Sequence, residues 1–235
     1  MKVCIITAVW KRPEIFNIFA EAIKSLEGDI TVCVAGSEGK KSKDMVEKHG
    51  FQYVETPNNP LGVKMNQAAI LASQTDADYY LLMGSDDIIN QALYDKYMHV
   101  AAKRWDYIYL KDSYFYDTKS KKAMYWAGYN RDRAKSELRL ALGCGRLISK
   151  RRMIRVRWQP WMNNKYHDLL DTGFDEKMML TKDISMPIRI EGTDMAILDI
   201  KSAVNMTCFA PWDNTKEIDK EEIFKMFPEN VVKLL

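Results

Sequence analysis

The sequence has few cysteines and no long apolar run, and both absences exclude classes of protein. Its four cysteines lie far apart and form no C-x-x-C pair, so neither a zinc site nor a disulfide framework is indicated. No window approaches the roughly 18 consecutive apolar residues that a membrane-spanning helix requires. The apolar run MKVCIITAVW lacks the small-residue cleavage site of a secretory signal. We therefore expect reduced, mostly buried thiols and a cytoplasmic location.

The sequence also lacks a strong charge imbalance and any marker of a domain boundary. A net charge of +3 and a pI near 8.5 do not by themselves indicate nucleic-acid binding. There is no internal repeat, low-complexity tract or linker rich in proline and glycine. With 235 residues, 47% of them hydrophobic, the chain is long enough to bury a sizeable core. We expect one domain over residues 1–235.

The first part of the chain, up to Asn90, alternates strand-like and helix-like patterns, which is typical of parallel strands joined by crossover helices. Apolar runs predict strands at residues 3–10, 29–37, 51–57 and 76–87. Helical spacing of apolar residues predicts helices at 13–27, 40–50 and 63–75. A further helix at 91–104 and an aromatic-rich hairpin at 105–129 follow. The sequence thus predicts an α/β fold with parallel strands at its centre.

Polar segments follow each of the four predicted strands. In order along the chain they are TAVWKRP, GSEGKK, NNPLGVKMN and GSDD. Ligands bind open α/β sheets beyond the carboxyl ends of the strands, where loops vary without disturbing the core. We therefore expect these four segments to form one site.

The GSDD segment places Asp86 and Asp87 side by side at the end of a buried strand. Adjacent carboxylates repel and are poorly solvated there, so a cation should offset the cost. A divalent metal carrying a diphosphate would do so, because hard cations prefer carboxylate and phosphate oxygens. The alternative is that one of the two aspartates caps the following helix. Both interpretations stay open on this stretch alone.

Taken together, TAVWKRP, NNPLGVKMN and LLMGSDDII resemble the motifs of inverting, family 2 nucleotide-sugar glycosyltransferases. The resemblance implies a Rossmann-like, A-type glycosyltransferase fold, with a mixed, mostly parallel central sheet flanked by helices. It also implies that Asp86 and Asp87 hold Mn²⁺ or Mg²⁺ on the sugar diphosphate. Gly84 stands where the first aspartate of that family's motif usually lies. The residues that the resemblance places at the nucleotide sugar are Thr7, Ala8, Trp10, Arg12, Lys64, Asn66 and Arg146.

A glycosyl transfer of the inverting type needs a general base that takes the proton of the acceptor hydroxyl. The segment GFDEKMMLTKD resembles the family's G-F-D-E segment and would give this role to Asp183. The segment NNKYHDLLDTG is similar to phage-type glycosyltransferases and would give it to Asp171, our first choice, with Asp168 as a third candidate. The alternative for each is a helix cap or a solvated carboxylate.

Residues 146–157 carry six basic side chains and no acidic one. Arginine suits bidentate phosphate binding, so Arg146 is a candidate clamp for the donor diphosphate. The segment could instead line a groove for a nucleic-acid acceptor, or be a solvated helix face.

We expect a metal-dependent glycosyltransferase that moves a hexosyl or pentosyl group from a nucleotide-diphosphate sugar to a hydroxyl of an acceptor, either a glycan or a modified base in DNA. Residues 1–90 would bind the donor and residues 91–235 the acceptor. One alternative is a nucleotidyltransferase, although TAVWKRP lacks the glycine-rich loop usual in that class. The other is an inactive module that binds nucleotide sugar or DNA. The stereochemistry of transfer stays open.

Overall fold

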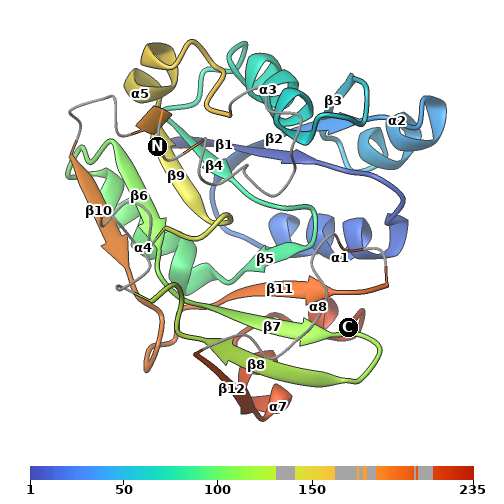
Figure 1. Cartoon of the computed structure of the whole chain (residues 1–235), viewed down its shortest axis with the longest axis vertical. Coiled ribbons are helices and arrows are strands. Elements are labelled where there is room, and N and C mark those ends of the chain that lie inside the picture. The colour runs from blue at the N-terminus through green and yellow to red at the C-terminus, as the bar shows by residue number, and fades with distance from the viewer. Residues whose placement is uncertain (131–140, 162–173, 175–176, 179–183, 204, 206–213) are drawn as a thin grey trace.

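Two β-sheets organise the chain, with helices packed around them (Figure 1). The computed structural model describes residues 1–130, 141–161, 174, 177–178, 184–203, 205 and 214–235. Within this part of the chain the larger sheet has seven strands and the smaller sheet has five.

The predicted alternation of strands and helices in the first part of the chain is confirmed. The strands are β1 (Lys2–Ala8), β2 (Asp29–Gly36), β3 (Gln52–Glu55) and β4 (Tyr79–Leu82). The helices between them are α1 (Pro13–Lys24), α2 (Lys40–Glu47) and α3 (Leu61–Ala72). These strands pair in parallel in the order β4, β1, β2, β3, so their carboxyl ends meet at one edge of the sheet.

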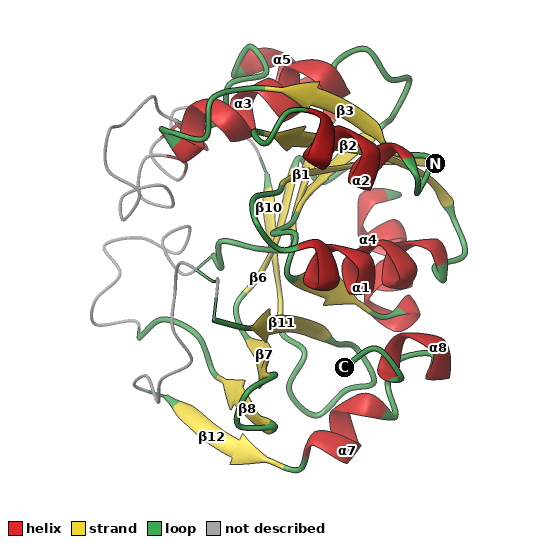
Figure 2. Cartoon of the chain, turned by 90° about the vertical axis from the view of Figure 1, so that its right-hand side faces the viewer, coloured by secondary structure: helices red, strands yellow, loops and turns green. Residues whose placement is uncertain are grey.

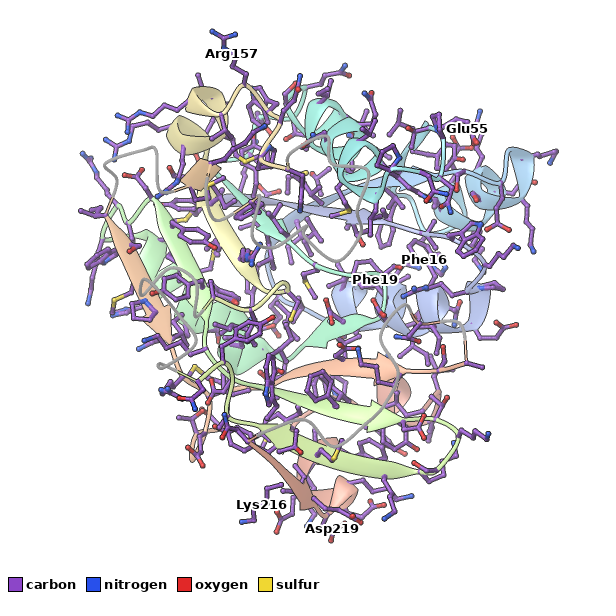
Figure 3. The ribbon with its side chains drawn as sticks, viewed as in Figure 1. Phe16, Phe19, Glu55, Arg157, Lys216 and Asp219 are labelled. Carbon is purple, nitrogen blue, oxygen red and sulfur yellow. The ribbon has the colours of Figure 1, made fainter. Side chains whose placement is uncertain are left out.

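Alternating residues of β1 build two hydrophobic cores, one on each face of the larger sheet. Val3 and Ile5 belong to the core on the α1 side, where Phe16 and Phe19 of that helix pack (Figure 3). Cys4 and Ile6 belong to the core on the α3 side. Because successive side chains of a strand point to opposite faces, both faces of β1 need covering. Figure 2 shows the helices on the two sides of the sheet.

The larger sheet is completed by strands from later in the chain. They are β6 (Tyr107–Leu110), β9 (Arg146–Ser149) and β10 (Ser185–Ile188). The helices α4 (Gln91–Ala101) and α5 (Lys150–Arg155) pack beside them. The strand order is β10-β6-β9-β4-β1-β2-β3, and β9 alone runs antiparallel to its neighbours. The predicted mixed, mostly parallel sheet is therefore confirmed.

The smaller sheet begins directly after the GSDD segment. Its strands are β5 (Asp87–Ile89), β7 (Ser113–Asp117), β8 (Lys122–Trp126), β11 (Ile197–Lys201) and β12 (Thr215–Ile218). They lie in the order β12-β8-β7-β11-β5, and β7 and β8 form the hairpin that the sequence predicted. Tyr116 and Ile200 of this sheet share the α1-side core with the C-terminal helices α7 (Lys220–Phe224) and α8 (Glu229–Val232).

The capping alternative for the aspartate pair is wrong. The helix after GSDD starts only at Gln91, and its N-cap is Asn90, whose side chain accepts a hydrogen bond from the backbone N–H of Leu93 at 3.1 Å. Asp87 lies three residues too early to do this, because β5 separates it from α4.

One buried carboxylate joins the two sheets. Asp112 lies between β6 of the larger sheet and β7 of the smaller one, and its side chain is fully buried. It accepts hydrogen bonds from the backbone N–H groups of Ile190 and Glu191, at 2.9 and 3.1 Å, and from the hydroxyl of Tyr125 at 2.8 Å. Residues 190 and 191 lie between β10 of the larger sheet and β11 of the smaller one, so Asp112 ties together two of the crossings between the sheets.

None of the helices in the described part of the chain combines the length and hydropathy needed to cross a bilayer.

Candidate active site

A buried lysine on α3 holds together three loops at the carboxyl edge of the parallel strands. Lys64 Nζ donates to the carbonyl oxygen of Val9 at 2.7 Å, to Ser37 Oγ at 2.8 Å and to Asn58 Oδ1 at 3.0 Å. An ammonium group has three protons, so these acceptors match its capacity. Lys64 is 1% exposed, and burial lowers its pKa to about 8. The segments after β1, β2 and β3 therefore meet as the sequence predicted.

Replacing Lys64 by methionine is expected to destabilise this edge. The variant keeps the length and apolar stem of the side chain but leaves three acceptors without their donor. A loss of about 2 kcal/mol in the free energy of unfolding should follow, measured by urea denaturation. Lys40→Met is the matched control, because that lysine is exposed and forms an ion pair with Asp44 on its own helix. Equal stability of the two variants would contradict this assignment.

The fourth segment reaches the same edge through an ion pair. Arg12 follows β1 and Asp86 follows β4, and Nη1 of the arginine lies 2.6 Å from Oδ2 of the aspartate. The side chains are 12% and 18% exposed, respectively. The pair is thus partly desolvated, which strengthens its attraction relative to a surface pair. It joins the first and last of the segments that the sequence predicted to form one site.

The tight turn of GSDD depends on Gly84. Its backbone N–H donates to Asp87 Oδ2 at 2.6 Å. A Cβ at this position would lie 2.5 Å from Asp86 Oδ1 and 2.8 Å from Asp87 Oδ2. The two carboxylates therefore occupy the space that any larger residue would need, which is a physical reason for glycine here.

Asp86 and Asp87 differ sharply in environment. Asp87 is 4% exposed, and burial, with the neighbouring charges of Asp199 and Asp86, raises its pKa well above the usual range. Burial therefore disfavours the charged form of Asp87, whose Oδ2 holds the turn through the N–H of Gly84. Asp86 is the member of the pair that reaches the edge and faces Arg12. The geometry favours a direct ligand role for Asp86 over one for Asp87.

Strand β11 supplies charged groups that the sequence analysis missed. Asp199 lies opposite Asp87 in the antiparallel pairing of β11 with β5, and its Oδ2 lies 2.6 Å from Lys201 Nζ. Burial raises the pKa of Asp199 to about 6, against the opposing effect of Lys201. Further along, Asn205 Nδ2 donates to Asp86 Oδ2 at 2.6 Å. The available signal was the alternation in LDIKS, which puts Asp199 and Lys201 on one face of an otherwise apolar strand.

The remaining residues predicted at the nucleotide divide between surface and interior. Trp10 is 40% exposed beside Arg12, with Lys11 Nζ 4.6 Å from its ring centroid, and Ala8 ends β1 partly exposed. Thr7 is fully buried, and its hydroxyl has no hydrogen-bond partner within the described residues. Trp10, Arg12 and Asp86 thus form the accessible part of the predicted donor site.

Asn66 and Arg146 make contacts with the protein itself. The Asn66 amide donates to the carbonyl of Trp161 at 2.9 Å and accepts from its N–H at 3.1 Å. Arg146 is buried, its Nε donates to the carbonyl of Leu142 at 2.5 Å, and its guanidinium carbon lies 4.4 Å from the ring centroid of Phe174. These contacts favour a supporting role behind the edge for both residues.

The basic segment after β9 runs away from this site. Ser149 lies opposite Tyr79 because β9 is antiparallel to β4, so α5 starts at the amino edge of the sheet. Arg152 is buried, whereas Arg157 projects into solvent beyond α5 (Figure 3). An acceptor groove lined by the exposed arginines would lie far from Asp86, which disfavours the nucleic-acid interpretation of this segment.

The predicted bases Asp171 and Asp183 lie outside the described residues, as does Asp168. Their role stays a prediction.

A divalent cation is the cofactor that the sequence resemblance implies, and Asp86 is the described residue that fits one. Such a cation is often held by one or two carboxylates, with phosphate oxygens and water completing its shell. No group of three or more His, Cys, Asp or Glu side chains in the described part of the chain is arranged to hold a metal ion. The described residues therefore fit a cation bound mainly through a diphosphate, with Asp86 as its carboxylate.

The arrangement of the sheets is shared with solved glycosyltransferase structures. Residues 1–349 of S. aureus TarS superpose with a TM-score of 0.64 and 15% sequence identity, over 85% of this chain and 60% of that one. This chain has the A-type glycosyltransferase fold. The same part of TarS in complex with UDP-GlcNAc superposes with a TM-score of 0.64 and 14% identity, over 96% of this chain. The chain spans 60 to 64% of the length of these TarS structures.

A second kind of enzyme also shares the fold. The synthetase for CMP-2-keto-3-deoxy-manno-octonic acid, solved with CTP, superposes with a TM-score of 0.52 and 12% identity, over 80% of this chain and 90% of that one. At these identities the likeness shows the fold alone. No protein-family model and no curated protein sequence matches the chain.

Proposed function

We propose that this protein is a glycosyltransferase that takes its sugar from a nucleoside-diphosphate donor. The observation that carries the proposal is the ion pair of Arg12 and Asp86, which brings a guanidinium and a carboxylate together outside the carboxyl ends of β1 and β4. In open α/β sheets this is where nucleotides bind. UDP-GlcNAc is bound by TarS, which has the same fold.

Each accessible residue has a task that suits its chemistry. Trp10 offers an exposed ring on which a base can stack, with Ala8 beside it at the end of β1. Arg12 can donate two parallel hydrogen bonds to a phosphate. Asp86 would hold Mn²⁺ or Mg²⁺, which when bound neutralises charge on the leaving diphosphate. Lys64 and Gly84 fix the loops that carry these side chains.

The transfer itself exchanges one bond of the anomeric carbon for another. The bond from that carbon to the diphosphate oxygen breaks, a bond to the acceptor oxygen forms, and the proton of the acceptor hydroxyl passes to a carboxylate. Asp171, or Asp183 after it, is the proposed carboxylate. The acceptor is a hydroxyl compound, and the transferred group is a hexosyl or pentosyl unit.

Thermal shift against a panel of nucleotides tests the proposal. The panel contains UDP-GlcNAc, UDP-glucose, GDP-mannose and dTDP-glucose, each with and without Mn²⁺. A ligand that binds the native state at 100 times its dissociation constant stabilises it by about 2.7 kcal/mol, which raises the melting temperature by roughly 5 to 10 °C in a chain of this size. No shift with any nucleotide sugar would overturn the proposal.

A nucleotidyltransferase is the second candidate, because the CTP-bound synthetase has a related fold. Such an enzyme binds a nucleoside triphosphate as its substrate. Adding CTP and UTP to the same panel separates the two functions: a shift with a triphosphate but with no nucleotide sugar would favour the second.

A further inference from the structure

The end of β11 holds Asp86 at two points. The backbone N–H of Ile200 donates to the carbonyl oxygen of Asp86 at 2.8 Å. The side chain of Asn205 donates to Asp86 Oδ2 at 2.6 Å. Both contacts come from a segment more than a hundred residues away in sequence, and neither belongs to the GSDD turn itself.

Asn205 is itself fixed on every side. Its Oδ1 accepts hydrogen bonds from the N–H and the hydroxyl of Ser202, at 2.8 and 2.6 Å. Its Nδ2 donates to the carbonyl of Ile200 at 3.1 Å as well as to Asp86. All hydrogen-bonding groups of this amide are therefore engaged in one orientation, so it presents an N–H to Asp86 that cannot rotate away without losing the others.

Arg12 does not provide the same fixed contact. Its long side chain comes from a loop, and a phosphate at this edge would compete with Asp86 for the guanidinium. The side-chain amide of Asn205 carries no charge, so a phosphate attracts it far less than it attracts the guanidinium of Arg12. When Arg12 turns to a diphosphate, Asn205 is the contact that keeps the Asp86 carboxylate in place.

We propose that Asn205, braced by Ser202, is a positioning residue that sets the orientation of the Asp86 carboxylate for donor binding. The inference rests on the proposed function and adds a residue to it. Partners that hydrogen-bond a ligating carboxylate typically change metal affinity or activity by about 10- to 100-fold when they are removed.

Isothermal titration separates positioning from a merely structural role. The probes are UDP, GDP, CDP and dTDP with Mn²⁺, and the one that the wild type binds is used throughout. Asn205→Ala should raise the dissociation constant about tenfold while the stoichiometry stays unchanged. A merely structural role would instead lower the stoichiometry and leave the dissociation constant of the folded fraction as it was.

Two further variants complete the test. Ser202→Ala removes the hydrogen bond from the Ser202 hydroxyl to Asn205 Oδ1 and should raise the dissociation constant of the nucleotide by a smaller factor. If Asn205→Ala does not fold, this variant decides the outcome. Thr118→Val is the matched control, because Thr118 Oγ1 donates to the carbonyl of Lys201 at 3.1 Å, at the same strand end but away from Asp86. The Thr118→Val variant should bind the nucleoside diphosphate with the same dissociation constant as the wild type.

The outcomes distinguish the two proposals. A wild type that binds none of the four diphosphates overturns the proposed function together with this inference. A wild type that binds one of them, with an unchanged dissociation constant in the folded alanine variant, overturns the inference alone.

Discussion

Asp86→Ala is expected to lose nearly all turnover of the nucleotide sugar while keeping its fold. The variant removes the carboxylate that would hold the cation and releases Arg12 from its ion pair. Loss of one group that stabilises the transition state typically costs about 100- to 1,000-fold in rate. Release of nucleoside diphosphate from the donor that the panel identifies is the measurement, alongside the melting temperature.

Two variants show whether the charge of Asp86 is the cause. Asp86→Asn preserves the shape of the side chain but does not neutralise Arg12 and binds a hard cation more weakly than a carboxylate does, so it should be nearly as inactive. Asp76→Ala is the control, because that aspartate also pairs with a basic side chain, that of Lys2, but at the exposed amino edge of the sheet. Turnover near the wild-type rate in either Asp86 variant would remove this residue from the site.

Asp112→Ala is expected to produce the largest loss of stability. It leaves the buried N–H of Ile190, the partly buried N–H of Glu191 and the buried hydroxyl of Tyr125 without their acceptor. Each unsatisfied buried group costs about 1 to 3 kcal/mol, so a loss on the order of 4 kcal/mol is expected. That corresponds to a fall of about 10 °C in melting temperature for a chain of this length, measured by calorimetry.

Tyr125→Phe is the comparison variant, because it should lose only part of the stability that Asp112→Ala loses. It removes one of the three hydrogen bonds and should cost about 1 kcal/mol. If Asp112→Ala proved no less stable than Tyr125→Phe, the carboxylate would not be the link between the two sheets. Because β11 belongs to the smaller sheet and Asn205 follows it closely in the chain, loosening this link should also weaken nucleotide binding at Asp86.

The two aspartates of GSDD have different environments, although the sequence shows them as equals. Asp87 points into the interior and accepts the N–H of Gly84, while Asp86 faces Arg12 at the edge. Asp86 lies in the turn before β5, whereas Asp87 is the first residue of that strand and is buried. If both aspartates held one metal ion, Asp87 would have to be charged, and its burial disfavours the charged form.

Local pattern was sufficient for the first part of the fold. Apolar runs and helical spacing predicted β1 to β4 and α1 to α3, because each is determined by the periodicity of its own residues. The meeting of their loops followed from the rule that parallel strands bring their carboxyl ends to one edge. That rule predicted that the segments carrying Arg12 and Asp86 meet, whereas the resemblance to family 2 glycosyltransferases assigned these two residues to the donor and the metal ion.

Only the tertiary structure decided how the site is held. The turn at Gly84 sends the chain from the larger sheet into the smaller one, so the residues after Asp86 form a strand that pairs with β11. That pairing brings Asp199 and Asn205 to the site across a separation that no local pattern encodes. The sequence by itself determined which strands and loops exist and where the edge carboxylate lies, since those depend on neighbouring residues. The burial of Asp87 and the hydrogen bonds from Ile200 and Asn205 to Asp86 depend on the long-range pairing of β5 with β11. They therefore exist only in the folded chain.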